Sequence, residues 1–128
     1  MDVFVPIDAS DASGRALEFG MRLADRYDGS LHVVHISDAE TEATDRVLAD
    51  ARETLAESDV EPELVLTDRF DVRPTARVGK EALRLAKERD ADHIVLGHSH
   101  VGAAESAILG SAAKTVVRAT DLPVTVVP

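Results

Sequence analysis

The chain has 128 residues, enough for one domain with a buried core, and its formal net charge is −10. A surface this acidic repels nucleic acid phosphates, which argues against DNA or RNA as a partner. The absence of cysteine excludes disulfides, a thiol nucleophile and thiolate metal sites. No apolar stretch reaches transmembrane length and the N-terminus is not a signal peptide, so we expect a soluble, cytoplasmic protein that contacts no membrane.

The proportion of Asp to Lys indicates the salt conditions in which the protein works. The acids are rich in Asp, whereas lysine is confined to Lys80, Lys87 and Lys114. High Asp with little Lys favours a halophilic protein, because concentrated salt screens the repulsion between like charges. The alternative is an ordinary acidic protein.

Apolar runs and helical periodicity alternate along the whole chain. Short runs of Val, Ile and Leu between turn residues are typical of buried strands, and apolar residues at helical spacing predict amphipathic helices. Pro6 indicates that the last residues of the first strand leave the sheet, and Pro74 suits the first turn of a helix. Gly79 costs its helix up to about 1 kcal/mol relative to Ala and marks close packing. We predict strands at 3–7, 31–36, 63–67, 94–96 and 123–127, and helices at 11–27, 41–58, 74–89 and 111–119.

This order of elements predicts an α/β fold in one domain over residues 1–128. Strands alternating with helices through short connections give a parallel sheet covered by helices on both faces, with right-handed crossovers. Ligands of such sheets bind beyond the carboxyl ends of the strands, where the strand order reverses. The strand ends available for binding are residues 8–10, 36–38, 68 and 97–102.

The stretch 93–113 combines a strand that breaks at Gly97 with a helix that opens on Gly110-Ser111. The first backbone N–H groups of a helix lack intrahelical partners and lie at its positive end, so this construction is typical of an anion site. No Lys precedes Ser111, which excludes a Walker motif. No base is paired with a nucleophile, so we expect no enzyme, although slow hydrolysis of a bound nucleotide stays open.

At these positions the chain resembles the universal stress protein family. The family signature is a glycine, two residues, a glycine, nine residues and then Gly-Ser or Gly-Thr, and Gly97 and Gly110-Ser111 have this spacing. The resemblance implies a three-layer sandwich of the adenine nucleotide alpha hydrolase-like type, with four helices and a five-stranded sheet in the order 3-2-1-4-5. It also implies a homodimer paired through the last strand, residues 124–127. Similar segments elsewhere are 5–10, 31–36, 90–97 and 122–127.

Members of the family that bind ATP imply an adenine and ribose pocket in this chain. By position, Pro6, Asp8 and the backbone around Ile36 would line that pocket. A carboxylate placed by a tight turn suits Asp8 to a ribose hydroxyl, since an ionised carboxylate accepts strong hydrogen bonds. The alternative is that Asp8 only caps the first helix or its turn.

The same resemblance implies the phosphate end of the site. Gly97 would let the ribose or phosphates approach the backbone. Gly110, Ser111 and the amide of Ala112 would hold phosphate oxygens, with Mg²⁺ or Mn²⁺ as the accompanying ion. None of the five histidines forms a recognised ligand spacing, so we predict no metal site made by the protein itself.

His100 departs from the family, because it stands where the signature has its second glycine. If the loop needs a positive φ there, His has a steric cost, and its side chain would fill the space of the outer phosphates. Conversely, His tolerates the left-handed region, and an imidazole can donate to phosphate or bind its metal. With His98 it would form a pH-sensitive anion site, and the plainer interpretation is a surface loop with two exposed histidines.

These observations predict a regulatory module that binds ATP at the loop after the fourth strand and acts in a stress response. The alternative is a dimeric interaction protein of the same fold that has lost the nucleotide. A phosphoacceptor receiver domain shares the architecture, and Asp8 and Asp68 resemble its acidic residues. It is excluded because no Lys follows the fifth strand.

The charge pattern gives a first prediction. If the protein is halophilic, its melting temperature will rise by several degrees or more between about 0.1 M and 2 M KCl, because salt screens the repulsion among its carboxylates. For a domain of this size each kcal/mol is worth roughly 3–6 °C. Calorimetry or circular dichroism at stepped KCl measures the change, and a melting temperature indifferent to salt would contradict the halophilic interpretation.

Overall fold

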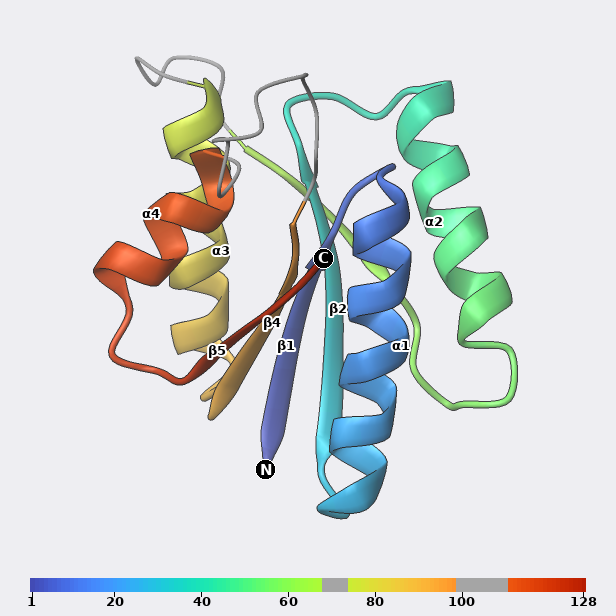
Figure 1. Ribbon diagram of the computed structural model, residues 1–128. Helices are drawn as coiled ribbons and strands as arrows, with labels where there is room; N and C mark the ends of the chain where they lie inside the picture. Colours follow the sequence, from blue (N-terminus) through green and yellow to red (C-terminus); the bar gives the residue numbers. More distant parts are fainter. Residues whose placement is uncertain (68–73, 99–110) are drawn as a thin grey trace.

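The computed structural model describes residues 1–67, 74–98 and 111–128, and all nine predicted segments form within them (Figure 1). Differences at the ends of most elements are one or two residues. In chain order the elements are β1 (Asp2–Ile7), α1 (Asp11–Arg26), β2 (Ser30–Ser37), α2 (Glu42–Thr54), β3 (Glu63–Leu66), α3 (Pro74–Glu88), β4 (His93–Gly97), α4 (Ser111–Ala119) and β5 (Val124–Val127).

The five strands form one parallel sheet in the order β3-β2-β1-β4-β5, which confirms the predicted order. β1 is central, and the chain runs outward from it to β3 before crossing to β4 on its other side. The strand order therefore reverses between β1 and β4. Pro6 and Ile7 still pair with β2, whereas the residues that pair with β4 are Val3 and Phe4. The carboxyl end of β1 thus leaves β4 but not β2, in partial agreement with the expectation from Pro6.

Two layers of helices cover the sheet and give the predicted three-layer sandwich (Figure 1). Val3 and Val5 lie in a core cluster with residues of α1 and α2, and Phe4 lies in a second cluster with residues of α3 and α4. This division follows from the alternation of side chains along a strand. Both clusters consist almost entirely of aliphatic side chains, and each Val, Leu or Ile among them stabilises the fold by about 1.5–3 kcal/mol when fully buried.

The helix α2 ends earlier than predicted. Thr41 caps its start through a reciprocal capping box with Thr44. The prediction of a helix to residue 58 was wrong, since regular structure ends at Thr54 and Leu55 is the C-cap. Ala56 and Ser58 donate to carbonyls three residues earlier, so the chain tightens into turns after Leu55 enters the core at 2% exposure.

Gly79 confirms the expected close packing. A Cβ at Gly79 would lie 2.6 Å from the Cβ of Thr115 and 3.0 Å from the carbonyl oxygen of Ala112. The first half of α3 therefore crosses the first half of α4 with no room for a side chain, which fixes where α4 begins relative to the sheet.

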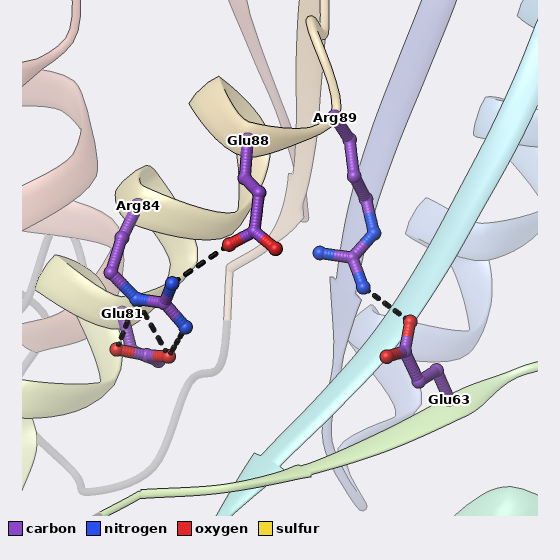
Figure 2. A network of polar contacts seen from close by, with 5 residues as sticks. All are labelled: Glu63, Glu81, Arg84, Glu88 and Arg89. Carbon is purple, nitrogen blue, oxygen red and sulfur yellow. Dashed lines mark hydrogen bonds and ion pairs between the residues drawn. The ribbon is translucent and has the colours of Figure 1, made fainter.

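An ion pair ties the end of α3 to the edge of the sheet (Figure 2). Arg89, directly after α3, pairs with Glu63 at the start of β3, although the two residues are far apart in sequence. On the exposed surface of α3, Arg84 pairs with Glu81 and Glu88 at helical spacing. Hydrogen bonding to Glu81 is the main cause that raises the pKa of Arg84, but solvent screens such exposed pairs and leaves them a small role in stability.

Candidate functional site

The predicted binding residues converge on the carboxyl edge of the sheet. Asp8 follows β1, Ile36 lies near the end of β2 and Gly97 closes β4. Because all strands are parallel, these ends lie at one edge, and the reversal of strand order between β1 and β4 is the usual position of a ligand in an open α/β sheet. The helices α1 and α4 also begin at this edge (Figure 1).

Three predicted residues belong to the α3/α4 side of this edge. Ile36 is 7% exposed and lies in the core cluster of that side. By alternation, Pro6 shares the face of Phe4, and it is half-buried. Ala112, in the first turn of α4, is half-buried as well. The structure therefore places the side chains of Pro6 and Ile36, at the ends of β1 and β2, on the same side of the sheet as the start of α4.

Asp8 is fixed by hydrogen bonds within its own turn. Its Oδ1 accepts from the backbone N–H of Ser10 at 2.8 Å and from the Ser10 hydroxyl at 2.5 Å. Its backbone N–H donates to Oγ of Ser13 at 2.8 Å, and Ser10 Oγ in turn accepts from the Ser13 N–H at 3.1 Å as the N-cap of α1. Asp8 thus stabilises the helix-capping turn, as one alternative held, while its carboxylate stays exposed to solvent.

Gly97 has a packing role that sequence reasoning did not find. A Cβ at Gly97 would lie 2.6 Å from the carbonyl carbon of Ala12 and 2.6 Å from the backbone nitrogen of Ser13. The first turn of α1 therefore lies directly on the end of β4. This contact accounts for the glycine without a ligand, and no pattern within the stretch 93–113 could have revealed it, because the contacting residues are distant in sequence.

The phosphate end of the predicted site is described only in part. Ser111 is the first residue of α4, so its place at the helix start agrees with the prediction. His100 and Gly110 lie outside the described residues, as does the rest of the loop between β4 and α4. The backbone of His98 continues the sheet by donating to the carbonyl of Val127 at 2.6 Å.

The three strand histidines each bond to a neighbouring strand. Nε2 of His32 lies 3.2 Å from Oδ1 of Asp2, and Nδ1 of His35 lies 2.8 Å from the carbonyl oxygen of Ile7. Nε2 of His93 lies 2.8 Å from Oγ1 of Thr125, and burial lowers the pKa of this imidazole. These contacts agree with packing roles. In the described part of the chain, no group of three or more His, Asp or Glu is placed to hold a metal.

A cleft of about 360 Å³ lies between α1 and α2, and Asp8, Ser10 and Ser13 are among the residues that line it. It has an apolar floor that includes Leu17 and Val47, and an acidic rim that includes Glu18 and Asp50. Because Pro6 and Ile36 face the opposite layer of helices, this cleft is not the predicted adenine pocket. Among the described residues no helix combines the length and apolarity that a membrane span requires.

Comparison with known proteins places these features in a family. Residues 1–128 match the model of the universal stress protein family. A universal stress protein from Archaeoglobus fulgidus is 24% identical, with a TM-score of 0.74 over 100% of this chain and 93% of that one. Another, from Archaeoglobus fulgidus DSM 4304, is 26% identical with a TM-score of 0.72, over 98% of this chain and 43% of that one.

A further fold neighbour is a universal stress protein whose crystal structure is a complex with cAMP. It is 23% identical, with a TM-score of 0.70 over 100% of this chain and 97% of that one. A search of the curated proteins finds no match.

Two glycines in contrasting surroundings give a matched prediction. Gly97→Ala will destabilise the protein by about 1–3 kcal/mol, because the new methyl group meets backbone atoms that cannot rotate away. Gly14→Ala, within α1, will instead stabilise it by up to about 1 kcal/mol, since a Cβ there meets nothing within 4 Å and Ala favours the helix. Urea unfolding of both variants measures the two changes. Equal stability of Gly97→Ala and the wild type would disprove the packing role of Gly97.

Proposed function

Because the chain belongs to the universal stress protein family, we propose that it is a regulatory module of the stress response that binds ATP at the carboxyl edge of its sheet. The observation that carries the proposal is the place of Asp8. Its exposed carboxylate is held by the Ser10 turn beside the point where the strand order reverses. Such a carboxylate would accept a hydrogen bond from a ribose hydroxyl.

The residues near Asp8 support a nucleotide as the ligand, with its adenine ring on one side of Asp8 and its phosphates on the other. Half-buried Pro6 offers apolar surface on which adenine would pack, and the backbone around Ile36, whose side chain is buried in the core, would line the same pocket. Towards the phosphates, the first turn of α4 offers backbone N–H groups that lack intrahelical partners, including that of Ala112, and the positive end of the helix dipole. The cAMP complex of a fold neighbour supports an adenine nucleotide as the ligand class.

The proposed module acts by binding rather than by catalysis. At the carboxyl edge of the sheet the described residues offer Asp8 as an acceptor and helix amides as donors, which are groups that hold a ligand. A divalent ion, Mg²⁺ or Mn²⁺, would accompany the ATP phosphates and neutralise their charge. This matters for a chain of net charge −10, which would otherwise repel them.

We also propose that the protein forms a homodimer through β5. This dimer is compatible with the nucleotide-binding module and with the alternative of a dimeric interaction protein. The carbonyls of Pro123 and Val127 accept from β4, so by alternation the backbone groups of Val124 and Val126 point away from the sheet. All four residues of β5 are half-buried in the monomer. An unpaired edge of this kind can pair with its copy about a two-fold axis.

Calorimetric titration tests the nucleotide proposal. ATP with Mg²⁺ or Mn²⁺ will bind saturably to the wild-type protein, in a salt concentration at which it is folded. Asp8→Asn will weaken binding about ten- to a hundredfold, because Asn keeps one oxygen for Ser10 but presents an amide donor in place of the second oxygen. Asp25→Asn, an equal loss of charge at the far end of α1, is the matched control and will bind like the wild type.

The same titration tests His100 and the alternative function. His100→Gly will strengthen binding if the side chain obstructs the phosphates, and will weaken it if the imidazole donates to them. Absence of heat at high concentrations of folded wild-type protein would reject ATP binding and favour the interaction protein.

The dimer has its own test at the two edges of the sheet. Val126→Pro will convert the dimer to a monomer, because it removes an outward N–H while leaving the bonds of β5 to β4 in place. Leu66→Pro on β3 is the matched control. The neighbouring Thr67 N–H donates to Ser37, so the Leu66 N–H also points away from the sheet, but at the opposite edge. Light scattering after size-exclusion chromatography measures the molar mass of each protein in solution. A Val126→Pro protein that stays dimeric would contradict pairing through β5.

A further inference from the structure

The hydrogen bonds around Asp8 close into a ring of three residues. The Asp8 N–H donates to Ser13 Oγ, the Ser13 N–H donates to Ser10 Oγ, and the Ser10 hydroxyl donates to Asp8 Oδ1. Each member both donates and accepts, and the Ser10 hydroxyl takes part in two of the three bonds, so rotation of the Ser10 side chain breaks both. A closed ring of this kind holds the Asp8 side chain in one rotamer before any ligand arrives.

The two carboxylate oxygens of Asp8 differ in their hydrogen bonds. Oδ1 accepts two hydrogen bonds from Ser10, one from its N–H and one from its hydroxyl, which uses both of its lone pairs. Among the described residues, no hydrogen bond reaches Oδ2. A ligand hydroxyl at this carboxylate therefore has one available oxygen, and that oxygen has a fixed direction.

Two contacts anchor the ring to the sheet. Ser13 is 3% exposed, and its backbone lies against the end of β4 at Gly97. His35 on β2 bonds through Nδ1 to the carbonyl of Ile7, the residue directly before Asp8. The turn is thus held from both neighbouring strands, β4 on one side and β2 on the other, and Asp8 is fixed relative to the whole edge rather than to α1 alone.

We infer that Ser10, Ser13 and His35 are positioning residues, which present Oδ2 of Asp8 as a preformed acceptor for one ribose hydroxyl. This inference rests on the proposed function. Preorganisation removes the cost of ordering the carboxylate when the nucleotide binds, and it makes affinity depend on the hydroxyl at one position of the sugar. The three residues act through Asp8 and need not touch the ligand.

Ser10 offers the cleanest test, because a conservative variant and a matched control both exist. Ser10→Ala breaks the ring, whereas Ser10→Thr keeps a hydroxyl at the same place. Thr41→Ala removes the corresponding N-cap of α2 and matches the loss of helix stability away from Asp8. Each protein is titrated with ATP, 2′-deoxy-ATP and 3′-deoxy-ATP, and its melting temperature is measured alongside.

The wild-type protein is expected to prefer ATP by about tenfold over at least one of the two deoxy analogues. Ser10→Ala will lose about five- to tenfold in ATP affinity and little in affinity for that analogue, so the preference falls towards one. Ser10→Thr and Thr41→Ala will keep the preference. In the ligand-free protein, three-bond couplings will report a single χ1 rotamer of Asp8 for the wild type and rotamer averaging for Ser10→Ala.

The possible failures are distinguishable. Folded wild-type protein that does not bind ATP would overturn the proposed function and the positioning role with it. A wild type that binds ATP while Ser10→Ala weakens ATP and both analogues equally would overturn the positioning role alone. An averaged Asp8 rotamer in the wild type would also overturn it, whatever the affinities.

Discussion

The contact between the first turn of α1 and the end of β4 is the constraint on which the carboxyl edge depends. Gly97 has no side chain, so the backbone of Ala12 and Ser13 can lie directly on β4. This contact places α1 across the point where the strand order reverses. It also places Ser13 where its hydroxyl receives the Asp8 N–H. A single missing methyl group thus sets the positions of a strand end, a helix start and the candidate binding carboxylate.

Division of the core into two clusters decides which side of this edge a ligand can use. Odd-numbered residues of β1 face α1 and α2, where Val5 packs, and even-numbered residues face α3 and α4, where Phe4 packs. Pro6 and Ile36 therefore present their apolar surface to the layer that contains α4. The cleft between α1 and α2 lies on the other side. The packing of Gly79 against Thr115 and Ala112 holds the start of α4 against α3, on the side of the sheet that Pro6 and Ile36 face.

Membership of the universal stress protein family and the geometry of Asp8 support the same function from different directions. Asp8 is at once part of a helix-capping turn and an exposed acceptor, so the two interpretations of this residue are compatible. The cap uses Oδ1, and the proposed ligand would use Oδ2. Structural and binding roles can coincide in one carboxylate because its two oxygens accept independently.

Local pattern by itself determined the elements, the fold class and the gathering of candidate residues at one edge. Apolar alternation and helical spacing depend on neighbours in sequence, and the resemblance supplied the strand order that the structure confirms. The end of α2 was missed, because Leu55 continues the buried helical stripe of Val47 and Ala51 although the regular helix ends at Thr54. Only the tertiary structure decided why Gly97 is a glycine, how Ser13 and His35 hold Asp8, and which layer of helices Pro6 faces. Each of these depends on contacts between segments distant along the chain, which no local pattern of residues encodes.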